Sequence, residues 1–118
     1  MRVLLIDDSL TMRHMEASQL CQLGINDIIQ AGDGQAGLEL LARHMPVDII
    51  LLDINMPVMD GMAVLKNIRN NRRYNGIKII MITSESEKSK VITALRAGAN
   101  DYLIKPFKPE DFKKRIVL

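Results

Sequence analysis

The residues of this 118-residue sequence best suited to chemistry are charged side chains that directly follow apolar runs. They are Asp7 and Asp8 after Val3–Ile6, Asp53 after Ile49–Leu52, and Lys105 after Tyr102–Ile104. A parallel strand buried on both faces reads as a continuous apolar run, and ligand sites in open α/β sheets form beyond the carboxyl ends of such strands. We therefore expect these charges to share one ionic site.

The three carboxylates of that site favour a hard divalent cation. Asp7, Asp8 and Asp53 in one crevice would repel one another and raise one another's pKa unless a cation joined them. Oxygen ligands without His or Cys suit such an ion, and Mg²⁺ suits a site with positions left for water and phosphate. The Lys105 ammonium cannot bind the metal, but it can hold a phosphoryl oxygen, and the Thr83 hydroxyl can donate to another.

Asp53 is the expected nucleophile of this phosphate chemistry. Phosphoryl transfer requires mainly positioning and charge neutralisation from a protein, and a carboxylate can itself attack, which gives an aspartyl phosphate. Asp53 stands alone at the end of its run, whereas the adjacent Asp7 and Asp8 are better arranged to hold a metal directly and through water.

Strand-like runs alternate with helical segments along the whole chain. The expected strands are Val3–Asp7, Asp27–Ala31, Ile49–Asp53, Ile77–Thr83 and Asp101–Ile104. Strict alternation of strands and helices predicts an α/β fold, a doubly wound parallel sheet with right-handed crossovers and helices on both faces.

Capping signals place the helices between these strands. Ser9 can cap the first helix, which runs to Leu23 and which Gly24 can end. Its apolar residues are expected on one side: Met12, Met15, Leu20 and Leu23. Ser84, with Glu87 three residues later, resembles a capping box for the fourth helix. The second helix is expected over Gly34–His44, the third after the turn-rich Met56–Gly61, and the fifth from Pro109.

Composition limits the classes of function. The chain is long enough for one domain with its own core, and 47% hydrophobic and 25% charged residues are typical of a soluble globular protein. No apolar run approaches the length that spans a bilayer, and no secretory signal begins the chain, so we expect a cytoplasmic protein without a membrane role. The net charge of +2, with basic residues scattered among acids, argues against nucleic-acid binding by this domain alone.

Together these motifs resemble the receiver domains of response regulators and are similar to the stand-alone chemotaxis regulators. The matching elements are Asp7–Asp8, Asp53–Gly61, Thr83–Ser84, Ala97–Tyr102 and Lys105–Phe107. The resemblance covers essentially residues 1–118 as one receiver domain. It implies a flavodoxin-like fold, a five-stranded parallel sheet of order 2-1-3-4-5 with five helices.

The resemblance also implies a phosphoryl donor and a metal. Asp53 would accept phosphate from a phosphohistidine on a sensor histidine kinase in a Mg²⁺-dependent reaction. Asp8, Asp53 and the backbone carbonyl of Asn55 would hold Mg²⁺, and Asp7 would act largely through a metal-bound water. Such a protein is a signalling domain that catalyses only its own phosphorylation and dephosphorylation, and not a conventional enzyme.

A conformational switch is a further implication of the resemblance. Lys105 and Thr83 would bind the phosphoryl oxygens, and movement of Thr83 toward the phosphate would let Tyr102 turn inward. That rearrangement would reshape the face made by the fourth helix, fifth strand and fifth helix, through which a downstream target or output domain reads the state. A cis bond between Lys105 and Pro106 would aim the lysine into the site.

Alternative functions differ at identifiable residues. A haloacid-dehalogenase-like phosphatase also uses an aspartate, a hydroxyl, a lysine and Mg²⁺, but expects a second aspartate where this chain has Asn55. A flavin carrier would need a Ser/Thr/Gly-rich phosphate loop after the first strand, where acids stand instead. A receiver that controls an output domain missing from this sequence, either DNA-binding or enzymatic, remains open beside the stand-alone regulator.

Two positions bear on the lifetime of the phosphorylated state. Family members differ two residues after the phosphoacceptor and two after the threonine, where side chains influence access of water to the acyl phosphate. These positions hold Asn55 and Glu85. The same polar pairing occurs in fast-resetting chemotaxis regulators, so we expect a short-lived phosphoryl state.

Overall fold

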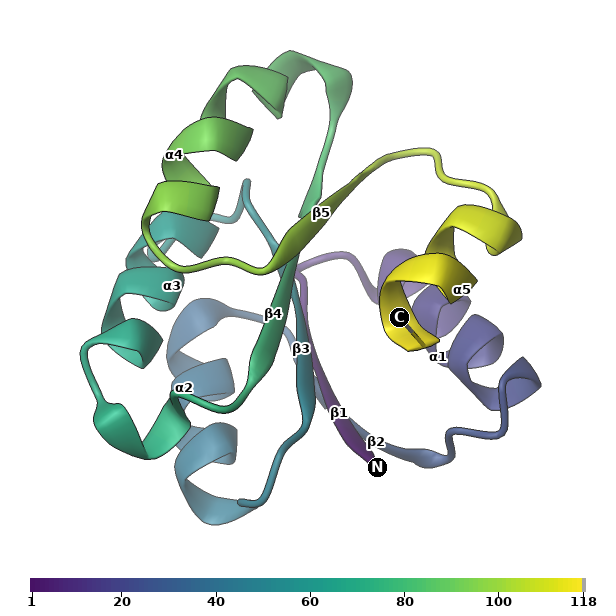
Figure 1. Cartoon of the computed structure of the whole chain (residues 1–118), viewed down its shortest axis with the longest axis horizontal. Helices are drawn as coiled ribbons and strands as arrows, with labels where there is room; N and C mark the ends of the chain where they lie inside the picture. The colour runs from purple at the N-terminus through teal and green to yellow at the C-terminus, as the bar shows by residue number, and fades with distance from the viewer. Residues whose placement is uncertain (118) are drawn as a thin grey trace.

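A five-stranded parallel sheet forms the centre of the protein (Figure 1). The computed structural model describes residues 1–117. The strands are β1 (Arg2–Ile6), β2 (Asp27–Ala31), β3 (Ile49–Asp53), β4 (Lys78–Thr83) and β5 (Asp101–Ile104). They lie in the order β2-β1-β3-β4-β5, and every neighbouring pair is parallel. The fold class and strand order expected from the sequence are confirmed.

Helices cover both faces of this sheet. The α-helices within residues 1–117 are α1 (Leu10–Gln22), α2 (Gly34–Arg43), α3 (Gly61–Arg69), α4 (Val91–Arg96) and α5 (Pro109–Val117). Short 3₁₀ helices, η1 (Arg72–Tyr74) and η2 (Glu85–Lys90), follow α3 and precede α4. Figure 1 shows α2, α3 and α4 on one face of the sheet and α1 and α5 on the other. The α1 and α2 helices each end one residue earlier than expected, at Gln22 and Arg43.

Each face of the sheet has its own hydrophobic core, because successive residues of a strand point to opposite faces. Leu4 and Ile6 of β1 join the core that α2, α3 and α4 cover. Val3 and Leu5 join the core that α1 and α5 cover. All of β3 is buried, as its continuous apolar sequence indicates.

The central pair of strands brings the first and second acidic motifs together. β1 and β3 are neighbours, with Ile6 opposite Leu52, so their carboxyl ends lie at the same edge of the sheet. Asp7 directly follows β1, and Asp53 is the last residue of β3. Their positions follow from strand order and register.

Three strand boundaries differ by one residue from the sequence prediction, and the first is the start of β1, which lies at Arg2 and not at Val3. β1 ends at Ile6 and not at Asp7, because the Asp7 carbonyl accepts a hydrogen bond from the Arg13 guanidinium and not from a strand. β4 begins at Lys78, since the N–H of Ile77 closes the preceding turn. None of these changes moves a side chain of the predicted site.

The predicted buried side of α1 is wrong at one position. Ser9 caps the helix as expected, and its Oγ accepts a hydrogen bond from the Met12 N–H at 3.1 Å. Met15, however, is 37% exposed, while Glu16 is buried. Residues four apart share a helix face, so Glu16 lies on the face that Met12 and Leu20 define, and Met15 lies beside it.

The predicted capping box at the fourth helix does not form. Ser84 precedes η2, but its side chain makes no capping hydrogen bond, and its Oγ lies 2.8 Å from the Ser86 Oγ. The Glu87 carboxylate pairs with Lys90 at 2.8 Å. The 3₁₀ turns of η2 separate Ser84 from α4, so the residues of the motif do not meet at an α-helical N-terminus.

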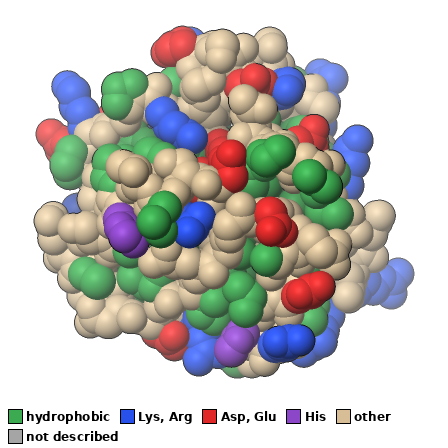
Figure 2. Space-filling model, turned by 180° about the vertical axis from the view of Figure 1, so that it is seen from behind, with side chains coloured by type: hydrophobic (Ala, Val, Ile, Leu, Met, Phe, Trp, Pro, Cys, Tyr) green, Lys and Arg blue, Asp and Glu red, His purple; other side chains and the backbone are tan. Residues whose placement is uncertain are grey.

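The surface carries charges of both signs. On the face seen in Figure 2, acidic and basic side chains are interspersed with apolar ones. No helix within residues 1–117 has both the length and the apolar character that crossing a membrane requires.

Candidate functional site

A cavity of about 270 Å³ opens at the carboxyl ends of β1, β3 and β4. The residues lining it are Asp7, Asp8, Ser9, Asp53, Asn55, Thr83, Ser84, Glu87 and Lys105. The structure therefore brings together six of the predicted site residues, and the seventh, Tyr102, lies outside the cavity lining.

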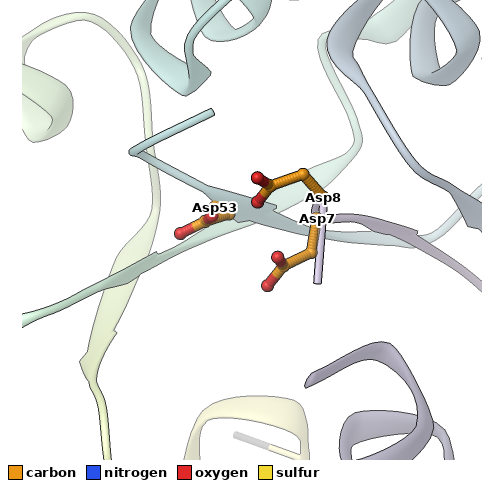
Figure 3. Close-up of side chains that lie close together, drawn as sticks. All are labelled: Asp7, Asp8 and Asp53. Atoms are coloured by element: carbon orange, nitrogen blue, oxygen red, sulfur yellow. The ribbon is translucent and has the colours of Figure 1, made fainter. Parts of the chain in front are cut away.

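Three carboxyl groups converge in this cavity. Carboxylate oxygens of Asp7, Asp8 and Asp53 lie within 4.8 Å of one another. Figure 3 shows Asp7 and Asp8 at the end of β1 and Asp53 on the adjacent β3. Asp7 and Asp53 are 1% and 4% exposed, whereas Asp8 is exposed to solvent. A cation bound by these two buried carboxylates and one exposed carboxylate would remain accessible to water.

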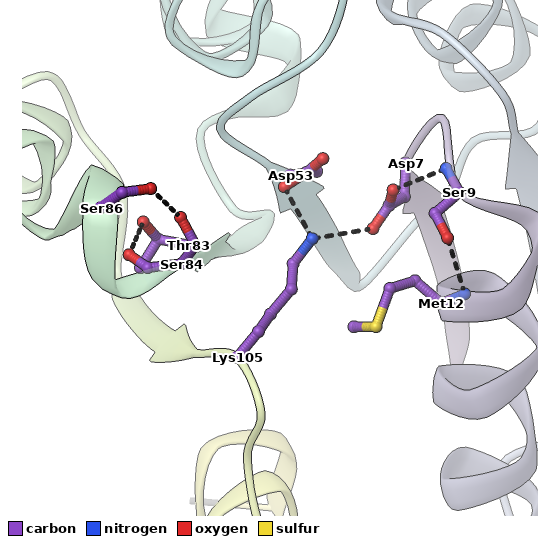
Figure 4. Close-up of polar contacts among 8 residues, drawn as sticks. All are labelled: Asp7, Ser9, Met12, Asp53, Thr83, Ser84, Ser86 and Lys105. Atoms are coloured by element: carbon purple, nitrogen blue, oxygen red, sulfur yellow. Dashed lines mark hydrogen bonds and ion pairs between the residues drawn. The ribbon is translucent and has the colours of Figure 1, made fainter.

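Lys105 places its ammonium between two of these carboxylates (Figure 4). Its Nζ lies 3.2 Å from Asp53 Oδ1 and 3.8 Å from Asp7 Oδ2. The Lys105 backbone N–H donates to the Thr83 carbonyl at 2.6 Å, which joins the ends of β4 and β5. The expected cis bond between Lys105 and Pro106 is present.

Asp7 is held by the start of α1. The backbone N–H of Ser9 donates to Asp7 Oδ1 at 2.8 Å, and the Arg13 guanidinium donates to the Asp7 carbonyl at 2.6 Å. The other carboxylate oxygen, Oδ2, is buried and accepts no hydrogen bond. One oxygen of Asp7 is thus fixed, while the second is available to a ligand of the cavity.

Burial makes the two central acids reluctant to ionise. Burial raises the pKa of Asp53 to about 6, and the neighbouring Asp7 adds to this effect, while Lys105 opposes it. Burial also raises the pKa of Asp7, against the Ser9 N–H and Lys105. A cation bound between the carboxylates would favour their ionised forms.

Thr83 and Asn55 line the same cavity as Asp53. Thr83, the last residue of β4, is 1% exposed, and its Oγ1 donates to the Ser84 carbonyl at 3.2 Å. Asn55 is exposed in the loop that follows β3. Tyr102 lies on β5 opposite Met81, half-buried and packed against the core under α2, α3 and α4.

Comparison with known proteins identifies this arrangement. Residues 3–117 match the family model described as response regulator receiver domain. The chain belongs to the response regulator receiver family. It is 40% identical over 116 residues to a chemotaxis protein CheY homolog of Campylobacter jejuni, a match that covers 98% of this chain and 89% of the relative.

Solved receiver structures agree with the family assignment. The chemotaxis protein CheY4 of Vibrio cholerae is 34% identical with a TM-score of 0.88, and the match covers 98% of this chain and 94% of that chain. NtrX of Brucella abortus is 26% identical with a TM-score of 0.86, but the match covers 96% of this chain and 25% of that chain. The receiver fold thus occurs in chains of similar length and as part of a longer one, and this receiver belongs to two-component signalling.

The donor set of the receiver domain fits a hard cation. The group offers carboxylate oxygens from Asp7, Asp8 and Asp53 and no His or Cys ligand among the residues that line the cavity. Asp7 Oδ2 is a buried acceptor without a hydrogen bond, which a cation or its water would satisfy. These oxygens match the preference of Mg²⁺.

The sequence prediction missed three polar residues of this region. Ser9 and Glu87 line the cavity, and Glu16 is a buried acid on the inner face of α1. The spacing of Glu16 four residues after Met12 and four before Leu20 is the signal that could have placed it inside. No sequence pattern predicts that Glu87 lines the cavity, because the backbone of η2 determines where its side chain points.

Proposed function

We propose that this receiver domain accepts a phosphoryl group on Asp53 from a phosphohistidine of a sensor histidine kinase, in a Mg²⁺-dependent reaction. The observation that carries the proposal is the set of charged groups around Asp53. This buried carboxylate lies beside the carboxylates of Asp7 and Asp8 and 3.2 Å from the Lys105 ammonium, at the floor of an open cavity. The same groups supply the positioning and charge neutralisation that phosphoryl transfer needs.

The acidic residues would share the work of holding the metal. We assign direct ligation to Asp8, Asp53 and the backbone carbonyl of Asn55, and ligation through water to Asp7. Bound Mg²⁺ would neutralise negative charge on the carboxylates and on the incoming phosphoryl group. Asp7 Oδ2 accepts no hydrogen bond and lies 3.8 Å from the Lys105 ammonium, which supports a water-mediated role for this residue.

Asp53 acts as the nucleophile in this scheme. Its pKa of about 6 leaves the carboxylate ionised in most molecules at neutral pH. An Asp53 oxygen forms the new O–P bond while the P–N bond of the phosphohistidine breaks, and the electron pair returns to the imidazole, which takes up a proton. Lys105 holds one phosphoryl oxygen, and Thr83 donates to another after its hydroxyl leaves the Ser84 carbonyl.

The signal would leave the site through Thr83 and Tyr102. We assign the output to the face formed by α4, β5 and α5, where the half-buried Tyr102 can move inward once Thr83 turns toward the phosphoryl group. Ile92 and Leu95 of α4 are 63% and 40% exposed on the surface, and they offer apolar contacts to a downstream target. No nucleic acid or membrane partner is part of this proposal, which assigns the protein to the cytoplasm.

Two alternatives to this function remain. A receiver that controls an output domain in a longer chain uses the same chemistry. It differs only in the domain or protein that responds to its phosphorylation. A haloacid-dehalogenase-like phosphatase is disfavoured by Asn55, which stands where that mechanism needs an acid. In the main proposal, residues 1–118 form one receiver domain that catalyses only its own phosphorylation and dephosphorylation.

Intact mass spectrometry tests the chemistry. We expect the protein incubated with Mg²⁺ and acetyl phosphate to gain one alkali-labile phosphoryl group, and Asp53→Asn to gain none. Asp27→Asn, which changes an exposed aspartate at the start of β2, is the matched control and should be phosphorylated like the unaltered protein. No adduct, or an adduct on Asp53→Asn, would overturn the assignment of Asp53, and an equal adduct without Mg²⁺ would overturn the metal dependence.

A further inference from the structure

Glu16 is a buried carboxyl that the proposed chemistry does not use. It is 1% exposed on the inner face of α1, between Met12 and Leu20, which both pack in the core that α1 and α5 cover. Its Oε2 is buried and has no hydrogen-bond partner. Burial of a carboxyl group without a hydrogen-bond partner costs folding free energy. A hydrogen bond that Glu16 forms in another state of the phosphorylation site would offset this cost in that state.

The start of α1, one turn before Glu16, is attached to the phosphorylation site. Ser9 and Arg13 at the start of the helix both donate hydrogen bonds to Asp7. Figure 4 shows Met12 extending from α1 toward the space beside Lys105. Glu16 follows Met12 by four residues, so it lies one turn further along the same helix face. Burial, and secondarily the charge of Asp7, raise the pKa of Glu16 to about 8, while Lys105 and Arg13 lower it.

Lys105 is the better candidate of these two cations for contact with Glu16. Arg13 is engaged elsewhere, because its Nη1 donates to the Asp7 carbonyl and its Nε to Gln30 Oε1 at 3.2 Å. The Lys105 ammonium has three N–H donors, and it pairs with Asp53 at 3.2 Å and, more distantly, with Asp7 at 3.8 Å. No ion pair joins Glu16 to Lys105 within residues 1–117, so their contact requires a shift of the lysine.

We propose that Glu16 is a positioning residue for Lys105, accepting a hydrogen bond from its ammonium when that ammonium turns to the phosphoryl group on Asp53. This inference rests on the proposed phosphorylation of Asp53. As the phosphoryl group is transferred, negative charge moves from the Asp53 oxygen that Lys105 contacts here to the phosphoryl oxygens, and the ammonium needs a second partner in its new direction during the transfer. A carboxyl oxygen beneath the site would hold it there and direct a second N–H toward the phosphoryl oxygens.

A double-mutant cycle on the phosphorylation rate tests the proposal. With Mg²⁺ and acetyl phosphate, Glu16→Leu should be phosphorylated about three- to tenfold more slowly than the unaltered protein. Glu16→Gln keeps an oxygen acceptor and should remain within about twofold. In a Lys105→Met background, Glu16→Leu should change the residual rate by less than about twofold, because the group on which Glu16 acts is gone.

Gln19→Leu is the matched control. Gln19 lies on the same helix and also has a buried oxygen, Oε1, without a hydrogen-bond partner, but it lies further from Lys105 along α1. Its substitution should leave the rate within about twofold. A second measurement, NMR relaxation of the labelled Lys105 side chain with Mg²⁺ and a beryllium fluoride phosphate mimic, should show a more mobile side chain in Glu16→Leu and not in Gln19→Leu.

The outcomes separate this inference from the function on which it rests. Absence of phosphorylation in the unaltered protein would overturn the proposed function itself. If the unaltered protein is phosphorylated normally, but Glu16→Leu slows the rate equally with Lys105 and in the Lys105→Met background, only the proposed role of Glu16 is overturned. Equal effects of Glu16→Leu and Gln19→Leu on rate and mobility would overturn this role as well, since packing would then explain both.

Discussion

Gly61, the first residue of α3, lies directly against the backbone of Asp53. Its N–H donates to the Ile54 carbonyl at 2.8 Å, and a Cβ added at Gly61 would overlap the Asp53 carbonyl oxygen. Backbone atoms cannot move aside as the end of a flexible side chain can. The absence of a side chain at this residue therefore sets how closely α3 approaches the proposed phosphoacceptor.

Gly61→Ala should destabilise the protein and slow its phosphorylation. We expect a loss of about 1–3 kcal/mol in the free energy of unfolding, measured with denaturant, because α3 must move away from the end of β3. Gly76→Ala is the control, since an added Cβ there meets no atom within 4 Å. That substitution should leave stability unchanged or raise it by up to about 1 kcal/mol. Equal stability of the two variants would contradict the close approach.

Lys105 should control the ionisation of Asp53 in the absence of metal. The pKa of Asp53, about 6, results from burial and the charge of Asp7, and Lys105 opposes both. Lys105→Met should therefore raise this pKa further, and Mg²⁺ should lower it. Titration of the Asp53 carboxyl carbon by NMR measures both changes. Lys108→Met, at an exposed lysine of the following loop, should leave the titration unchanged, and a similar shift in both variants would count against the ion pair.

Glu16 should make stability fall as pH rises. Its pKa is raised from 4.5 in the unfolded chain to about 8 in the folded protein. Between these values the unfolded chain releases a proton that the folded protein keeps, so unfolding becomes easier by up to about 1.4 kcal/mol per pH unit. Below 4.5 both states hold the proton, and above about 8 neither does.

Denaturant unfolding of Glu16→Gln across pH 4.5 to 8 checks this effect. The variant should become progressively more stable than the unaltered protein as pH rises, and the gap should level off above about 8. Gln19→Leu, which changes no titratable group, should give a curve parallel to that of the unaltered protein. A constant gap for Glu16→Gln would show that the carboxyl titrates alike in both states.

Asn55 and Glu85 should shorten the lifetime of the phosphorylated state. Both side chains are exposed, and Asn55 lines the cavity that holds Asp53. Replacing both with methionine should slow the loss of phosphate, because apolar side chains hinder the approach and orientation of attacking water. The decay of the phosphorylated mass after removal of the donor measures the lifetime. Asn75→Met with Glu110→Met, two exposed positions away from the cavity, should decay like the unaltered protein.

Local patterns were sufficient for most of the fold and of the candidate site. The strand β3 is buried and nearly continuously apolar, so it could be bounded from the sequence. The expected bounds of the partly buried β2 and β5 were also correct, and those of β1 and β4 were correct to within one residue. Polar residues at strand ends stand out against apolar runs. The strand order, in contrast, came from the resemblance to a family, since it depends on crossovers that local patterns do not specify.

Side-chain directions outside the strands were less predictable. Ser84 and Glu87 have the spacing of a capping box, yet the 3₁₀ turns of η2 send Glu87 to Lys90 and into the wall of the cavity. Met15 looked like a core residue of α1 and is exposed. In each case packing against the rest of the molecule determined the outcome, and the residue type alone did not.

The sequence by itself determined which groups this receiver domain brings to its site: carboxylates, a hydroxyl and an ammonium, each at or just beyond the end of a predicted strand. Only the tertiary structure decided how these groups interact. It sets Lys105 between Asp53 and Asp7, raises the pKa of both acids by burial, and encloses Glu16 beneath them. The physical reason is that these interactions depend on distances and burial between segments far apart in the chain, which no local pattern records.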